Sequence, residues 1–123
     1  MGQCGIQIGN SFWQTVCSEH DIDLGGNRYG EPEGRYDDVL FQESQSGRFV
    51  PRAVLVDLDP SQIESQRVGK YSNLYSPACF FKGTRSAANN WAVGHYTDGA
   101  EMVDSILDYA RKQAEQCDCI QGF

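Results

Sequence analysis

A strand, a polar turn and a helix start follow one another in Val50-Pro51-Arg52-Ala53-Val54-Leu55-Val56-Asp57-Leu58-Asp59-Pro60. The apolar run at residues 54–56 is rich in β-branched side chains, which is typical of a short strand buried on both faces. Asp59 is suited to cap a helix, and Pro60 to be its first residue, because a missing N–H costs nothing there. We therefore predict a strand over residues 49–58 and a helix from Pro60 to about Val68 that stops at Gly69.

Amphipathic helices are predicted on both sides of this segment. Over residues 5–17, apolar side chains recur every four positions, and a longer apolar stripe follows Asp98 near the end of the sequence. Asp98 and Glu101 have the spacing of a capping box, which places the start of the second helix at Asp98. The two predicted stripes are Cys4, Ile8, Phe12 and Val16 in the first helix, and Val103, Ile106, Leu107, Ala110 and Ala114 in the last.

Two more short strands complete an alternating pattern. Residues 79–81 are predicted to form one, and residues 119–123 to open another. Residues 21–47 are predicted to be a long polar loop, anchored by Tyr36, Val39, Leu40 and Phe41. The order helix, strand, helix, strand, helix, strand predicts an α/β layer with a parallel sheet. Ligands of such sheets bind beyond the carboxyl ends of the strands, where loops lead into helices.

Composition narrows the possible functions. The 123 residues are enough for one domain, and the net charge of -7 argues against nonspecific binding to nucleic acid or to an anionic membrane. The sequence has no apolar run of the ~20 residues that cross a bilayer, and its first residues do not have the pattern of a signal peptide. The cysteines number five, and Cys117 and Cys119 are too close for a Cys-x-x-Cys site, so we expect free thiols in a reducing compartment.

Two loops could bind phosphate or a hydrated metal ion. Residues 2–5 open a helix, whose free N–H groups and partial positive charge suit an anion, and the Gln3 amide could face a phosphate. The alternative is an ordinary turn. Asp57 and Asp59 follow a strand, and two carboxylates there can hold hydrated Mg²⁺ beside a phosphate. Here the alternative is that Asp59 only caps the next helix.

A third loop, Ser86-Ala87-Ala88-Asn89-Asn90-Trp91, combines small residues with amides. Small side chains permit a close approach to the backbone, and asparagine can donate to phosphate oxygens. The alternative is a tight connection into the helix that follows, with His95 as a packed or capping residue. The sequence has neither a Walker loop nor a G-x-G-x-x-G fingerprint, and no spacing suggests a Ser-His-Asp set or a Cys-His pair.

Four motifs, given at the end of this paragraph in chain order, resemble those of the tubulin family. The match spans the whole chain and is weakest between Gly25 and Gly47. Cys4, Trp91 and the Cys-Asp-Cys near the end are more similar to β-tubulins, whereas Asn10 and Cys17 are more similar to α-tubulins, so we expect a divergent β-tubulin-like chain. The motifs are Gly2-Gln3-Cys4-Gly5-Ile6-Gln7-Ile8-Gly9, residues 50–60 quoted above, Ala88-Asn89-Asn90-Trp91-Ala92 with Gly94-His95-Tyr96-Thr97, and Cys117-Asp118-Cys119-Ile120-Gln121-Gly122-Phe123.

This resemblance implies a guanine-nucleotide site that takes GTP and Mg²⁺. Asp59 stands where the family usually has glutamate, and it would help to hold the hydrated Mg²⁺ together with Gln3. Gln7 would approach the nucleoside, and Asp57 matches an acidic position of the second loop. The phosphate-binding positions would be Gly2, Gln3 and Cys4 in the first loop and Ala87, Ala88 and Asn89 in the loop that faces the terminal phosphate.

The resemblance also implies that residues 1–123 are an incomplete N-terminal GTP-binding domain of the tubulin type. Its Rossmann-like parallel sheet would lack the first strand and would be cut in the fourth. Strands next to a missing central strand have unpaired N–H and C=O groups. We therefore expect the isolated chain to be poorly stable, to bind GTP weakly or not at all, and to be inactive alone.

The function that the resemblance implies is structural. The chain would be a GTP-binding subunit of the αβ-tubulin dimer in the cytoplasmic microtubule cytoskeleton, with an α-tubulin-like partner and no nucleic acid or membrane. In that family GTP hydrolysis belongs to the assembled polymer. One alternative is a truncated gene product with no independent activity. Another is a small independent nucleotide hydrolase, for which we find neither a catalytic base nor a complete site in the sequence.

Overall fold

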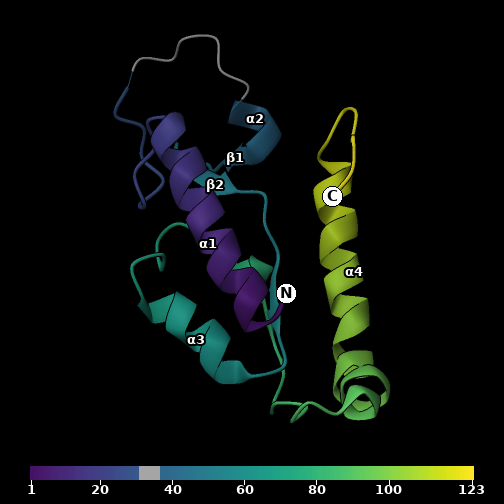
Figure 1. The fold of residues 1–123 in the computed structure, drawn as a ribbon. Coiled ribbons are helices and arrows are strands. Elements are labelled where there is room, and N and C mark those ends of the chain that lie inside the picture. The colour runs from purple at the N-terminus through teal and green to yellow at the C-terminus, as the bar shows by residue number, and fades with distance from the viewer. Residues whose placement is uncertain (31–36) are drawn as a thin grey trace.

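The computed structural model describes residues 1–30 and 37–123 as a mixed α/β chain, shown in Figure 1. Its strands form two separate two-stranded sheets. Tyr36, a predicted apolar anchor, lies outside the described residues. The elements, in order, are α1 (Gly2–Glu19), α2 (Asp37–Leu40), β1 (Phe41–Glu43), β2 (Phe49–Pro51), β3 (Leu55–Asp57), α3 (Pro60–Val68), the 3-10 helix η1 (Pro77–Cys79), β4 (Phe80–Lys82), the π-helix η2 (Val93–Asp98) and α4 (Gly99–Glu115).

The single strand predicted over residues 49–58 is wrong, because two strands lie there. β2 pairs antiparallel with β1, and β3 pairs in parallel with β4. Pro51 has no N–H to continue a ladder, and the Ala53 N–H donates back to the Pro51 carbonyl at 2.9 Å, so the chain turns between the strands. The predicted α/β class with a parallel sheet is confirmed by the β3–β4 pair.

Helix α3 agrees with the prediction at both ends. Pro60 is its first residue, and the Oδ1 of Asp59 accepts a hydrogen bond from the Ser61 N–H at 2.9 Å. Gly69 follows its last residue. The strand predicted at residues 79–81 is β4, displaced by one position because η1 includes Cys79.

Two predictions about less regular segments fail. Residues 21–47 are not one loop, since they contain α2 and β1. Phe41 of β1 is 1% exposed and belongs to the hydrophobic core.

Residues 119–123 form no strand in the structure, and Ile120 and Phe123 are 45% and 88% exposed. A strand needs a neighbour with which to pair, and no described strand lies against this segment.

Helix α1 buries a face that shares only Val16 with the predicted stripe. Ile8 and Phe12 are 65% and 52% exposed, and Cys4 is exposed as well. A strict four-residue spacing moves around an α-helix by about 40° at each step, so it cannot follow one face. The observed spacing alternates three and four, which keeps the side chains aligned. The buried residues are Ile6, Asn10, Trp13, Val16 and Cys17.

The core lies between α1, the strands and α3. Ile63 of α3 and Leu74 of the following turn are fully buried. A polar contact also crosses this region: the Tyr75 hydroxyl donates to Asn10 Oδ1 at 2.9 Å, and Asn10 Nδ2 donates to Gln66 Oε1 at 2.6 Å. Because both ends of the buried Asn10 amide have partners, it joins α1 to α3 without leaving a polar atom unpaired.

The β3–β4 pair lies between α1 and α4 (Figure 1). α1 packs on β3, while Phe81 of β4 meets Tyr109 of α4 with ring centroids 5.7 Å apart. α4 itself has no buried residue, and Val103 and Leu107 of its predicted apolar stripe are 44% and 60% exposed. Helices on both sides of a parallel strand pair are the arrangement that alternating helices and strands predict.

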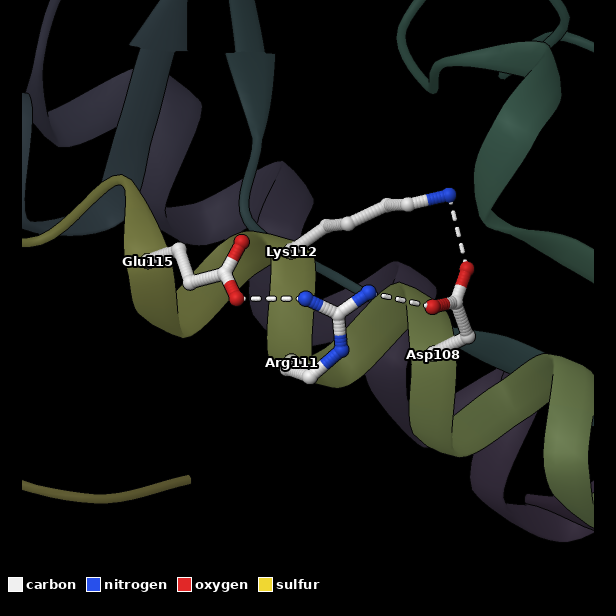
Figure 2. Close-up of polar contacts among 4 residues, drawn as sticks. All are labelled: Asp108, Arg111, Lys112 and Glu115. Atoms are coloured by element: carbon white, nitrogen blue, oxygen red, sulfur yellow. Dashed lines mark hydrogen bonds and ion pairs between the residues drawn. The ribbon is translucent and has the colours of Figure 1, made fainter.

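Exposed ion pairs run along α4, as Figure 2 shows. Arg111 pairs with Asp108 at 2.6 Å and also with Glu115, and Lys112 pairs with Asp108 at 2.7 Å. Hydrogen bonds from Lys112 and Arg111 hold the pKa of Asp108 below its usual value. Exposed pairs of this kind contribute little individually, so they add only modestly to the stability of α4.

The capping box predicted at the start of α4 is wrong. η2 runs directly into α4, and Asp98 makes no side-chain capping bond. Asp98 is instead buried, with Arg85 as its ion-pair partner at 3.4 Å. π-Helical turns are uncommon and often occur at functional sites, which draws attention to this junction.

Candidate functional site

The first predicted loop, residues 2–5, is the opening turn of α1. No side chain caps this helix end in the described structure, and its first turn contains no acidic residue. Gly2 has φ +68°, and nothing lies within 4 Å of a Cβ placed on it. Gln3 and Cys4 are exposed, as is Gln7 one turn further on. Free N–H groups with open space in front of them suit an anion such as a phosphate.

In the second loop, Asp59 acts as the cap of α3. Its Oδ1 accepts from the Ser61 N–H at 2.9 Å and from the Ser61 hydroxyl at 2.7 Å, and these bonds hold the pKa of Asp59 below its usual value. Asp57 Oδ1 accepts from the Asp59 N–H at 3.1 Å. The predicted capping of α3 by Asp59 is therefore confirmed. One carboxylate oxygen of Asp59 still has no hydrogen bond within the described part of the chain.

The third loop contains a tight turn of unusual backbone conformation. The Asn90 N–H donates to the Ala87 carbonyl at 2.9 Å, and the two residues between them, Ala88 and Asn89, have φ values of 49° and 60°. Positive φ at both central positions is characteristic of a type I′ turn. For alanine the left-handed region costs about 1–2 kcal/mol, so the surrounding structure imposes this shape.

Asn90 connects this turn to the following helix. Its Oδ1 accepts from the Ala92 N–H at 3.0 Å and from the Val93 N–H at 3.2 Å. The alternative of a tight connection into a helix is thus confirmed for Asn90. Asn89 is exposed and makes no side-chain hydrogen bond within the described residues, so its amide is available to a ligand.

The second and third loops meet around Leu58. The Gly83 N–H donates to the Asp57 carbonyl at 2.9 Å. A Cβ placed on Gly94 of η2 would lie 3.7 Å from the Ala87 Cβ and 3.8 Å from Leu58 Cδ1. Leu58 of the second loop therefore lies next to Gly83 and Gly94, one on each side of the third loop.

The first loop joins the others less directly. Gly5 and Gly9 of α1 line a small pocket with Ala53, Val54 and Leu55, at the start of β3 rather than at its carboxyl end. In the described residues no hydrogen bond or ion pair links Gln3 to Asp57 or Asp59. The structure thus brings the second and third loops near one another through Gly94 of η2, whose Cβ position is close to both Leu58 and Ala87, and it places Gly5 and Gly9 of α1 beside residues 53–55.

Sequence reasoning missed one side chain at this site, Arg85, and gave Asp98 and His95 other roles. Arg85 lies directly before the third loop with a side chain that is 65% exposed. Its Nε faces Oδ2 of Asp98, and the Asp98 side chain is 8% exposed. The only signal in the sequence was that Arg85 is the single lysine or arginine between Gly83 and Asp98. His95, predicted to be packed or capping, is exposed and stacks on Trp91 with ring centroids 4.7 Å apart.

The donor groups fit a hydrated magnesium ion beside phosphate. Within residues 1–30 and 37–123, no group of three or more His, Cys, Asp and Glu side chains could hold a metal ion by themselves. Mg²⁺ usually keeps several waters and needs only one or two carboxylates plus phosphate oxygens. Asp57, Asp59 and Gln3 have the oxygen atoms for that mode.

Two further observations bear on the class of protein. Of the helices in the described ranges, none combines the length and the apolar composition needed to cross a bilayer. Residues 1–123 match a family model whose description is Tubulin/FtsZ family, GTPase domain. This match covers the three loops, the parallel strand pair and α4.

Proposed function

The chain belongs to the Tubulin/FtsZ family of GTPase domains, and on that premise we propose that it is a β-tubulin-like, GTP-binding subunit that pairs with an α-tubulin-like partner in microtubules. The family is one of cytoskeletal GTP-binding proteins that assemble into polymers. Three parts of this proposal are more specific than the family: the β-tubulin-like type, the dimer with an α-tubulin-like partner and assembly into microtubules. They rest on the motifs in residues 2–9, 88–97 and 117–123.

One observation carries the nucleotide-binding part: the N-terminus of α1 is uncapped, free of acidic side chains and open in front of its glycines. A helix of 18 residues presents a partial positive charge there. In the proposed site, Gly2, Gln3 and Cys4 contact phosphates, and Gln7 approaches the nucleoside. When bound, Mg²⁺ would supply charge neutralisation between phosphate oxygens.

The other two loops have complementary roles in the proposal. Asp57 and Asp59 would hold water molecules of the hydrated metal ion through their carboxylates. Ala87, Ala88 and Asn89 would face the terminal phosphate beside η2, where Ala88 and Asn89 are exposed and Ala87 is half-buried. The Ala88 N–H already donates to the Ser86 hydroxyl at 3.2 Å, so the donors to the phosphate would be the backbone N–H groups of Ala87 and Asn89 and the Asn89 amide. Backbone N–H groups in such turns form concavities that bind anions.

The test is a nucleotide titration of the chain, read by amide NMR so that weak binding is measurable. We expect GTP with Mg²⁺ to shift the amide resonances of residues 2–5 and 86–89, and ATP to shift them less. Gln3→Ala should weaken GTP binding. Gln42→Ala, which removes an exposed glutamine of β1, is the matched control and should not. Equal response to GTP and ATP, or equal affinity in the parent and Gln3→Ala chains, would contradict the proposed site.

The partner is tested separately. Purified α-tubulin should form a complex with the chain in size-exclusion chromatography when GTP is present. If the chain binds GTP but forms no complex with α-tubulin, the proposed dimer is wrong and the proposed nucleotide site still stands.

A further inference from the structure

The geometry points to Arg85 as an additional phosphate-binding residue, positioned by Asp98, that favours a nucleoside triphosphate over a diphosphate. This inference rests on the proposed GTP site and adds a side chain that the predicted set does not contain. Arg85 immediately precedes Ser86 and the turn at residues 87–90. It therefore lies directly before the loop proposed to face the terminal phosphate.

The ion pair with Asp98 orients Arg85 from one side. The Asp98 side chain is 8% exposed, and the Arg85 Nε lies 3.4 Å from its Oδ2. A buried carboxylate without a partner is costly, so Asp98 holds the guanidinium at this edge. It sits at the end of η2, one turn beyond Gly94, which packs near Ala87. Arg85 and Ala87 are thus both fixed to the same helix.

Most of the guanidinium remains available. Arginine has five N–H donors, and within the described residues only the Nε–H of Arg85 has a partner. The side chain is 65% exposed, so its two terminal nitrogens are in reach of solvent and of a ligand. A planar guanidinium held at one edge can bind a phosphate with its other edge.

Arg85 supplies the positive charge next to the turn at residues 87–90. The chain carries a net charge of -7, and residues 83–97 contain no other lysine or arginine. Lys82, just before the loop, is engaged in an ion pair with Glu64. A terminal phosphate at the turn adds negative charge, which Arg85 is placed to neutralise. A diphosphate would not extend to the same position, so its binding should not depend on Arg85.

The experiment compares GTP and GDP, each with Mg²⁺, on the full chain and on Arg85→Ala, Arg85→Lys and Asp98→Asn. Arg67→Ala is the matched control, because Arg67 is an exposed arginine of α3 that pairs with Glu64 at 3.8 Å. We expect Arg85→Ala to weaken GTP binding by about tenfold, which corresponds to one charge-assisted hydrogen bond, and to change GDP binding less than about twofold. Arg85→Lys should recover part of the loss, and Asp98→Asn should show an intermediate loss.

A second readout does not depend on affinity. The Nε–Hε resonance of Arg85 should shift when GTP is added and should not shift with GDP. If Arg85→Ala loses affinity equally for GTP and GDP, or if the Arg85 resonance does not shift with GTP, the ion pair only stabilises the loop. Either result would overturn the inference. If GTP binds the parent and Arg85→Ala chains equally, the inference fails and the proposed function stands. If neither nucleotide binds the parent chain, both fail.

Discussion

Replacing Gly26 with alanine tests how the segment after α1 is fixed to the sheet. Gly26 is buried and has φ +83°. Its carbonyl accepts a hydrogen bond from the Phe49 N–H at 2.8 Å, at the first residue of β2. A Cβ on Gly26 would lie 2.6 Å from the Phe49 carbonyl oxygen, which is closer than two such atoms can approach.

The expected loss of unfolding free energy in Gly26→Ala has a backbone part and a packing part. Left-handed backbone costs an alanine about 1–2 kcal/mol, and the stiffer unfolded chain returns about 0.5–1 kcal/mol of that. Moving the Phe49 carbonyl disturbs packing and a backbone hydrogen bond, which costs about 1–3 kcal/mol more. We expect Gly26→Ala to lower the free energy of unfolding by about 2–4 kcal/mol.

Gly47→Ala is the matched control. Gly47 has φ +77°, but the nearest atom to a Cβ there is Glu43 Oε1 at 4.0 Å, so only the backbone effect applies. Its loss should stay below about 1.5 kcal/mol. Urea unfolding followed by circular dichroism gives both values, provided that the slopes agree. If the two variants lose the same stability, the close approach of Gly26 to Phe49 is not what restricts this position.

Three other predictions follow from burial and hydrogen bonding. Tyr75→Phe leaves Asn10 Oδ1 without its donor and should cost about 1–2 kcal/mol, and a double-mutant cycle with Asn10→Ala should show that the two losses are not additive. Asp59→Ala should lower the thermal midpoint more than Asp59→Asn, because asparagine also caps helices. The pKa of Asp59 is lowered in the folded chain, so the stability that Asp59 contributes is fully present above its ordinary pKa of 3.8. This stability should be lost as the pH falls through the lower pKa of the folded chain. Burial raises the pKa of the Cys17 thiol to about 11 and that of Cys79 to about 12, so mass spectrometry should find both unalkylated at neutral pH until the chain unfolds.

The elements that sequence predicts best are those fixed by local chemistry. α3 was predicted at both ends because an aspartate, a proline and a glycine act on their own neighbours. Likewise, the turn into η2 depends on Asn90, whose side chain reaches only two and three residues along the chain. Such contacts need no knowledge of the rest of the fold.

Long-range contacts explain the failures. Residues 49–58 look like one strand, yet Phe49 pairs with β1 and Leu55 with β4, so two different partners divide the segment. In α1, apolar spacing alone could not decide that Asn10 is buried and Ile8 exposed. The partners of Asn10 are Gln66 and Tyr75, far away in sequence.

The candidate site combines both situations. Each loop was recognisable from its own residues, but its neighbours were not. The spacing of Asp98 and Glu101 suggested that Asp98 served its own helix, whereas in the structure it belongs with Arg85 in the loop before that helix. Side chains whose partner lies across a loop are therefore the ones that a sequence motif assigns wrongly.

The position of the buried core determines how a substitution in the third loop affects the stability of the chain. The buried apolar residues of the described chain all lie at or before Cys79, and α4 buries none. Core stability therefore resides in α1, the strands and α3, while residues 83–98 lie at the margin of that core. Arg85→Ala leaves the buried Asp98 without its ion-pair partner, so we expect it to lower the unfolding midpoint, whereas Arg85→Lys keeps a cation beside Asp98 and should lower it less. Because GTP and GDP are compared on the same variant, a loss of stability alone would weaken the binding of both nucleotides equally, and only a loss confined to GTP reports what the loop binds.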